Sequence, residues 1–209
     1  MVNFKSMSRK EKIEYIWDYY KLHIFGGLIL IFFIGSFIHA QVTSVEYVAN
    51  LTIVAGITDE NKRENAEKSI TNLTVKSGEK RKQAFIDVIP IVDPQNPQPE
   101  LLQKLTVKIA TKEIDVIVLD KSIFQSLIKQ EAFLRLDSNY GLELTSIKNE
   151  KIEAVNNQNN KAIYAVSAEG IKILEDMGVD TKNKVLAIMS NSQHRENAII
   201  IFKWLLGIK

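Results

Sequence analysis

The chain has 209 residues, with 27 Lys and Arg, 25 Asp and Glu, and no cysteine. The first 21 residues carry five of the cations and three of the anions, so 22 charges of each sign remain in the rest. This balance argues against nucleic acid and other polyanions as partners. The lack of cysteine excludes disulfides, thiolate catalysis and metal sites that depend on Cys ligands.

The first predicted element is an amphipathic helix over residues 8–21. Ser8 and Glu11 stand in the spacing of a capping box, and apolar residues follow at i, i+3, i+4 and i+7. Aromatic side chains lie among basic ones in this segment, which suits the cytoplasmic headgroup layer of a membrane. We expect residues 1–21 to form a cytoplasmic lead into a membrane, and the alternative is a docking site for a cytoplasmic partner.

Residues 22–42 contain no Asp, Glu, Lys or Arg. Because a helix rises about 1.5 Å per residue and the hydrocarbon core is about 30 Å thick, roughly 20 apolar residues cross it. A buried helix of a soluble domain would show a polar face, which this segment lacks. We therefore predict a transmembrane helix over 22–42. Amphipathic rings near its ends are expected at the membrane interface: Tyr15, Trp17, Tyr19, Tyr20, His23 and His39.

The orientation follows from the flanking charges. Five cations precede the apolar run, whereas residues 43–61 carry no Lys or Arg. The positive-inside rule then keeps the N-terminus in the cytoplasm and places residues 43–209 outside the cell membrane as one extracytoplasmic domain. The competing interpretation is a signal peptide cleaved after Ala40. The long lead and the long apolar run favour an uncleaved signal anchor and a single-pass protein.

Strand and helix patterns alternate after the anchor. Strands are predicted over 45–55, 83–92, 114–119 and 184–189, and a hairpin joins 152–155 to 162–166 through the polar turn VNNQNNK. Helices are predicted from an Asp59 or Thr58 cap through residue 73 and over 100–112, 123–130, 140–148, 167–177 and 193–206. The expected class is α/β, a single three-layer domain with a mostly parallel (mixed) sheet and helices on both faces.

The sequence of this domain contains none of the common catalytic motifs. It has one histidine, His194, and no nucleophile elbow, zinc-protease, P-loop or dinucleotide-binding pattern. We therefore expect no enzyme, no cofactor and no metal. Asp115 and Asp120 bracket one strand but point to opposite faces, so no shared carboxylate site is expected, and Asp115 reads as a satisfied strand-end group. His194 is predicted to be a solvated surface residue.

Three strand-to-helix turns could bind an anion or another small ligand, because helix N-termini would meet at the carboxyl edge of the sheet. The same hydroxyl groups are also what ordinary helix N-caps require, so capping alone is the competing interpretation. The candidate ligand-binding residues in these turns are Asp120, Ser122, Ser167, Ser190 and Ser192.

Two resemblances add to these patterns. The opening KEKIEYIWDYYKLHIFGG is similar to that of uncharacterised single-span membrane proteins of low-GC Gram-positive bacteria, which implies topology and lineage but no activity. The segments IDVIVLDKSIFQSLIKQEAFLRLD, KAIYAVSAEG and SNSQHRENAIIIFKWLLG resemble, in this order, parts of the extracellular solute-binding proteins of ABC transporters. Glu131 stands where that family has glycine. The domain is too short for the family's two lobes, so the resemblance implies about one lobe.

The leading hypothesis is a non-enzymatic, membrane-anchored protein-interaction module, an accessory of a membrane or cell-envelope complex. The alternative is a small-ligand receptor that works with an ABC-type transporter. The apolar stripe of the last helix, which includes Phe202, is expected to pack into the core of the domain, with a partner-facing helix as the competing interpretation.

Overall fold

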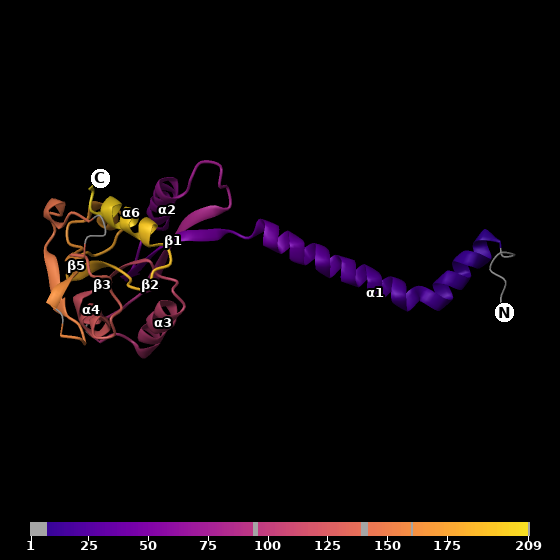
Figure 1. Cartoon of the computed structure of the whole chain (residues 1–209), viewed down its shortest axis with the longest axis horizontal. Coiled ribbons are helices and arrows are strands. Elements are labelled where there is room, and N and C mark those ends of the chain that lie inside the picture. The colour runs from indigo at the N-terminus through magenta and orange to yellow at the C-terminus, as the bar shows by residue number, and fades with distance from the viewer. Residues whose placement is uncertain (1–7, 94–95, 139–141, 160, 209) are drawn as a thin grey trace. The chain divides into compact units, whose positions relative to one another are not determined.

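The computed structural model describes residues 8–93, 96–138, 142–159 and 161–208 (Figure 1). It separates into two compact units, Met1–Ser44 and Val45–Lys209. Each unit is described below on its own.

The first unit is a single helix, α1 (Arg9–Thr43). The predicted capping box begins it: the backbone N–H of Glu11 donates to Ser8 Oγ, and the Glu11 carboxylate accepts from the Ser8 N–H over 2.7 Å. The amphipathic lead and the apolar run therefore form one continuous helix. By length and composition, this helix is long and apolar enough to cross a membrane, which is consistent with single-pass anchoring.

The second unit alternates strands and helices along the chain (Figure 1). The strands are β1 (Glu46–Ala55), β2 (Lys82–Pro90), β3 (Val116–Asp120), β4 (Lys151–Val155), β5 (Lys161–Ser167) and β6 (Lys184–Ile188). The helices are α2 (Glu60–Thr74), α3 (Pro99–Ala110), α4 (Lys121–Ile128), α5 (Lys172–Asp176) and α6 (Arg195–Leu205), with a short 3₁₀ turn, η2 (Leu144–Ser146).

The strands form one six-stranded sheet in the order β2-β1-β3-β6-β5-β4. β2 and β3 both pair with β1 in parallel, whereas β6 is antiparallel to β3 and β5, and β4 is antiparallel to β5. Four strands, β1, β2, β3 and β5, thus run in one direction, and β4 and β6 run in the other. The predicted α/β class with a mixed sheet is confirmed, and β3 is central, with a parallel neighbour on one side only.

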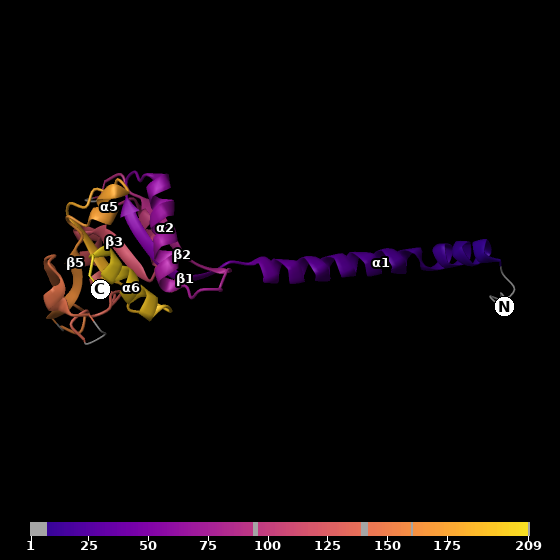
Figure 2. The same ribbon diagram turned by 90° about the horizontal axis from the view of Figure 1, so that it is seen from above.

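The core lies in two layers, one on each face of the sheet. Successive strand residues point to opposite faces, so β3 contributes Val116 and Val118 to one apolar cluster and Ile117 and Leu119 to the other. Helices α2, α5 and α6 cover the first face, and α3 and α4 cover the second (Figures 1 and 2). Phe202 of α6 is fully buried, so the prediction that this helix packs into the core is confirmed.

One edge of the sheet is closed by side chains of α2. Thr71 Oγ1 and a Glu67 carboxylate oxygen accept from the backbone N–H groups of Ala84 and Ile86, each over 3.0 Å. Arg63 donates to the Ile86 carbonyl over 3.0 Å. An edge strand with free backbone groups invites another strand to add to it, and here these groups of β2 are already bonded.

Two predicted helices differ from the structure. The helix expected from Ser167 begins only at α5, because Gly170 has a φ of 75°, which lies outside the helical region. Ser167 is instead the last residue of β5. The helix expected over 140–148 begins outside the described residues, and its described part contains only η2.

Candidate functional site

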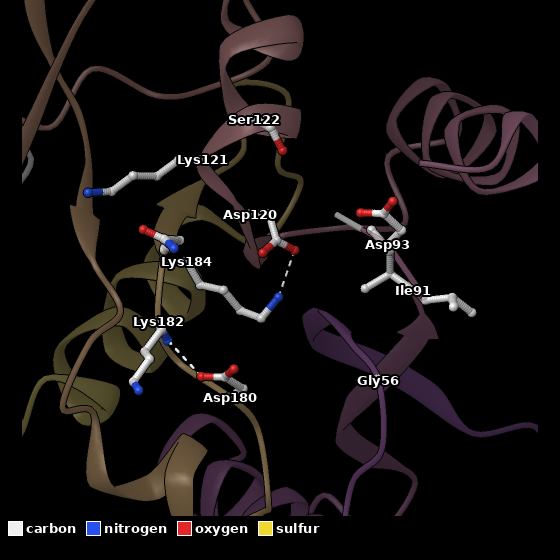
Figure 3. A pocket seen from close by; sticks show the side chains of 11 residues that line it. Gly56, Ile91, Asp93, Asp120, Lys121, Ser122, Asp180, Lys182 and Lys184 are labelled. Carbon is white, nitrogen blue, oxygen red and sulfur yellow. Dashed lines mark hydrogen bonds and ion pairs between the residues drawn. The ribbon is translucent and has the colours of Figure 1, made fainter. Parts of the chain in front are cut away.

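A pocket of about 800 Å³ lies where β1, β2 and β3 end (Figure 3). Parallel neighbours end at the same edge of a sheet, and crevices at the carboxyl ends of such strands are the usual ligand sites of α/β proteins. The pocket is lined by three carboxylates and three ammonium groups: Asp93, Asp120, Asp180, Lys121, Lys182 and Lys184.

A buried ion pair lies in the wall of this pocket. Lys184 Nζ is 2.7 Å from Asp120 Oδ2, and the two side chains are only 6% and 8% exposed. The sheet builds the pair, because Asp120 and Lys184 are register partners across the antiparallel β3–β6 ladder. A buried charge is costly unless it is paired, so each residue requires the other.

Two apolar side chains next to the pocket are exposed to solvent. Ile57 is 87% exposed and Val92, which lines the pocket, is 86% exposed. They follow neighbouring strands, and the Ile91 N–H donates to the Ala55 carbonyl over 3.1 Å, which holds the two chain segments together. Single exposed apolar residues are ordinary, but a pair on adjoining segments beside a charged pocket makes a small apolar patch.

Two of the five predicted ligand-binding residues, Asp120 and Ser122, lie together in the pocket. Ser122 was expected to cap α4, but the N-cap position falls on Asp120, whose carboxylate bonds Lys184 and makes no cap hydrogen bond. The prediction that Ser122 caps the helix is therefore wrong. The role of both residues in binding a ligand stays a prediction.

The other three predicted residues do not line the pocket. Ser167 ends β5 at the same edge of the sheet as Asp120, but it is buried, and its hydroxyl accepts from the Glu169 N–H over 3.3 Å. Ser190 and Ser192 follow β6, which runs against β3, so they lie at the opposite edge of the sheet, beside the amino end of β3. The expectation that all three turns meet at the carboxyl edge is wrong, because the direction of β6 is reversed.

Ser192 belongs to a cluster around Asp115, the residue before β3. Asp115 is fully buried, and its carboxylate accepts from Ser192 Oγ over 2.6 Å and from the Asn50 N–H over 2.8 Å. His194 Nδ1 lies 3.1 Å from the same carboxylate. The expectation that Asp115 is a satisfied strand-end group is confirmed, and it shares no site with Asp120.

The cluster corrects two further predictions. His194 is not a solvated surface residue, since its side chain is only 28% exposed and contacts Asp115. Ser192 does not cap α6, because the N-cap position is His194, whose side chain makes no cap hydrogen bond. A nucleophilic triad needs the imidazole between serine and carboxylate, whereas here both Ser192 and His194 contact the carboxylate.

The predicted membrane-interface residues all lie on α1 and are exposed. Tyr15 stacks on Tyr19 with ring centroids 6.0 Å apart, and Tyr20 meets His23 edge to face at 6.0 Å. Their place at a membrane interface stays a prediction, as it does for Trp17 and His39.

Sequence reasoning missed Lys184, Lys182, Asp180 and Asp93. The one signal for Lys184 was a lysine at the start of the otherwise apolar segment KVLAI, which mirrors the aspartate at the end of VIVLD. Across the described ranges, no three His, Cys, Asp or Glu side chains gather as a metal ion would require.

Comparison with known proteins gives a weak structural similarity. No family model and no curated protein matches the chain. Among solved structures, the chain is similar to "Extracellular solute-binding protein family 1 from Alicyclobacillus acidocaldarius subsp. acidocaldarius DSM 446", with 12% identity and a TM-score of 0.32. The match covers 59% of this chain and 28% of that chain, so this chain spans little more than a quarter of that protein. These values are too low to carry over an activity.

Proposed function

We propose that this chain is a single-pass membrane protein whose extracytoplasmic domain binds another protein of the cell envelope and has no enzymatic activity of its own. The observation that carries this proposal is the apolar patch of Ile57 and Val92 beside the charged pocket. An apolar centre bordered by polar and charged groups is the usual composition of a protein–protein interface.

The charges of the pocket support recognition of a protein surface. Its three carboxylates and three ammonium groups balance, so it suits a partner that presents both signs. Complementary charges steer a partner and reject wrong ones, whereas the apolar patch supplies the area removed from water. The ion pair of Asp120 and Lys184 holds this edge of the sheet in one geometry.

Site-specific crosslinking tests the interface. A photo-crosslinking amino acid replaces Ile57 or Val92 in the full chain, which is then irradiated in its native membrane. We expect the same partner adduct from both positions. Leu73 on α2 and Val107 on α3 are exposed by 50% and 53% and serve as controls that should give no such adduct. Equal adducts from all four positions, or none from 57 and 92, would count against the interface.

The orientation of the anchor has its own test. Protease added outside intact protoplasts should remove residues 45–209 and spare residues 8–21, because the positive-inside rule keeps the lead in the cytoplasm. The mass of the protein isolated from membranes should correspond to a chain that begins at Met1. A domain that resists the protease, or a mature protein that begins at Gln41, would overturn the signal-anchor assignment.

A second candidate function is a small-ligand receptor that works with a transporter. The pocket volume of about 800 Å³ favours it, since small-molecule sites commonly measure about 300 to 1,000 Å³. A thermal-shift screen of residues 45–209 against sugars, amino acids, peptides and metals tests this candidate. A binder at 100 times its dissociation constant should add about 2.7 kcal/mol to the free energy of unfolding. The shift should disappear when Asp120 and Lys184 are both made apolar.

A further inference from the structure

The turn between α2 and β2 is strongly basic. Residues 76–82 contain four cations, Lys76, Lys80, Arg81 and Lys82, and one anion, Glu79. Lys82 Nζ lies 2.8 Å from Glu79 Oε1, and this hydrogen bond lowers the pKa of Glu79 and raises the pKa of Lys82. Both members of the pair therefore stay charged at neutral pH, and the turn keeps an excess of three positive charges.

This basic turn lies beside the first residue of β1. The Glu46 N–H donates to the Arg81 carbonyl over 2.9 Å, and Glu46 is the register partner of Lys82. β3 pairs with β1 only from Leu51 onward, so the amino ends of β1 and β2 extend past β3 as a two-stranded ribbon. The basic turn is the tip of this ribbon on the β2 side.

The same ribbon carries an exposed aromatic residue. Tyr47 is 43% exposed and packs against Phe85 with ring centroids 5.1 Å apart. Val45, just before β1, is 47% exposed. Tyrosine beside lysine and arginine is the combination that a membrane headgroup layer accepts, because the ring is partly apolar and the cations meet lipid phosphates.

The tether between the two units is very short. α1 ends at Thr43 and β1 begins at Glu46, so only Ser44 and Val45 lie between them. The three residue steps from Thr43 to Glu46 span at most about 11 Å when fully extended. When α1 crosses a bilayer, the start of β1 and the basic turn bonded to it are therefore held close to the lipid headgroups.

We propose that the turn 76–82, with Tyr47 beside it, contacts the anionic headgroups of the bilayer in which α1 is anchored. The inference rests on the membrane anchoring stated under the proposed function. Lys and Arg near an anionic surface are attracted to it over about one Debye length, roughly 8 Å at physiological salt. The pocket lies at the other end of β1 and β2, so this contact leaves the patch of Ile57 and Val92 available to a protein partner.

The lack of cysteine makes a direct test possible, because one introduced thiol carries a unique label. The full chain with Ser77→Cys is spin-labelled and reconstituted into vesicles of phosphatidylcholine, with or without phosphatidylglycerol. With the anionic lipid we expect the label to be shielded from a water-soluble relaxing agent several-fold more than in phosphatidylcholine alone. The shielding should fade at about 1 M salt, where the Debye length is about 3 Å. A label at Ser122→Cys, at the pocket edge, should stay accessible in both vesicles.

The charges themselves are tested by a triple variant in the same labelled chain, Lys76→Gln, Lys80→Gln and Arg81→Gln. It should lose the lipid-dependent shielding at position 77. The matched control removes three exposed lysines elsewhere, Lys104, Lys129 and Lys172, and should keep it. Equal melting temperatures of the two triple variants exclude unfolding as the cause.

Three outcomes would overturn the inference. Shielding at position 77 that is equal in both vesicles and insensitive to salt indicates a protein contact instead of lipid. Equal loss in both triple variants indicates a general effect of net charge. If the chain is not retained in the vesicles, the membrane-anchored function itself fails. Retention with an accessible label at 77 overturns only the lipid contact.

Discussion

Two aspartates at the ends of β3 have nearly the same burial and opposite surroundings. Asp115, before the strand, is fully buried, and a backbone N–H, a hydroxyl and an imidazole surround its carboxylate. Asp120, at the end of the strand, is 5% exposed and bonds Lys184 in the wall of an open pocket. The first is enclosed by its own protein, whereas the second lines a pocket with five other charged side chains.

The difference teaches that burial alone does not distinguish a carboxylate enclosed by the protein from one that lines an open pocket. Asp115 links the amino end of β3 to β1 and to the turn before α6, so these contacts give its buried carboxylate a structural role. The Asp120 carboxylate bonds Lys184, and Lys184 lines the same pocket. Variants at the two positions should therefore separate stability from binding.

The largest loss of stability is expected when one member of the buried ion pair is removed. Asp120→Ala leaves the Lys184 ammonium buried without its carboxylate, which should cost about 3 to 5 kcal/mol of the free energy of unfolding. Urea unfolding of residues 45–209, followed by the fluorescence of Trp204, measures this cost. The paired change Asp120→Leu with Lys184→Met should restore most of the stability, because both charges are gone. A double variant as unstable as the single one would show that the pair has other structural partners.

A somewhat smaller loss is expected at the enclosed aspartate. Asp115→Asn replaces a charged acceptor by an amide, whose NH2 group would face hydrogen-bond donors of the cluster. This change should cost about 2 to 3 kcal/mol of the free energy of unfolding. The folded variant should still form the crosslink at Val92 in full yield. The double variant Asp120→Leu with Lys184→Met should lose that crosslink. If both variants keep the crosslink, the Asp120–Lys184 pair has no role in binding the partner.

A third change removes one of the hydrogen-bond donors to Asp115. Ser192→Ala removes the hydroxyl that donates to Asp115 and accepts from the His194 N–H, while Asn50 and His194 still face the carboxylate. The expected cost is about 1.5 kcal/mol, since one charge-assisted hydrogen bond is lost. The midpoint of urea unfolding should fall without a change of slope. Ser190→Ala, which removes a hydroxyl that donates to the Glu131 carbonyl, should have a smaller effect.

The smallest effect is expected at Asp137, a partly exposed carboxylate outside both sites. A hydrogen bond from Arg135 over 2.6 Å lowers the pKa of Asp137. A lowered folded pKa stabilises the protein above the unfolded pKa of about 3.9, and this gain is lost as the pH falls through the folded value. Asp137→Asn should therefore be slightly destabilising at neutral pH and nearly neutral in acid. A difference that grows in acid would contradict this assignment.

The sequence by itself determined the elements that depend on neighbouring residues. The uncharged run 22–42 and the Ser8–Glu11 capping box are local, and α1 follows from them. The alternation of strand and helix patterns determined the α/β class. The polar turn after Val155 predicted the β4–β5 hairpin, because the two strands are close in sequence. The deep burial of α6 followed from its own apolar stripe.

Only the tertiary structure decided how these elements meet. A strand has the same side-chain period in either direction, so the sequence could not show that β6 runs against β3. That reversal moves Ser190 and Ser192 away from the predicted site and brings Lys184 to Asp120, 64 residues away. It also carries Ser192 and His194 to Asp115, 77 and 79 residues away. Such contacts are set by strand order and register, which depend on the packing of the whole domain and not on any local pattern.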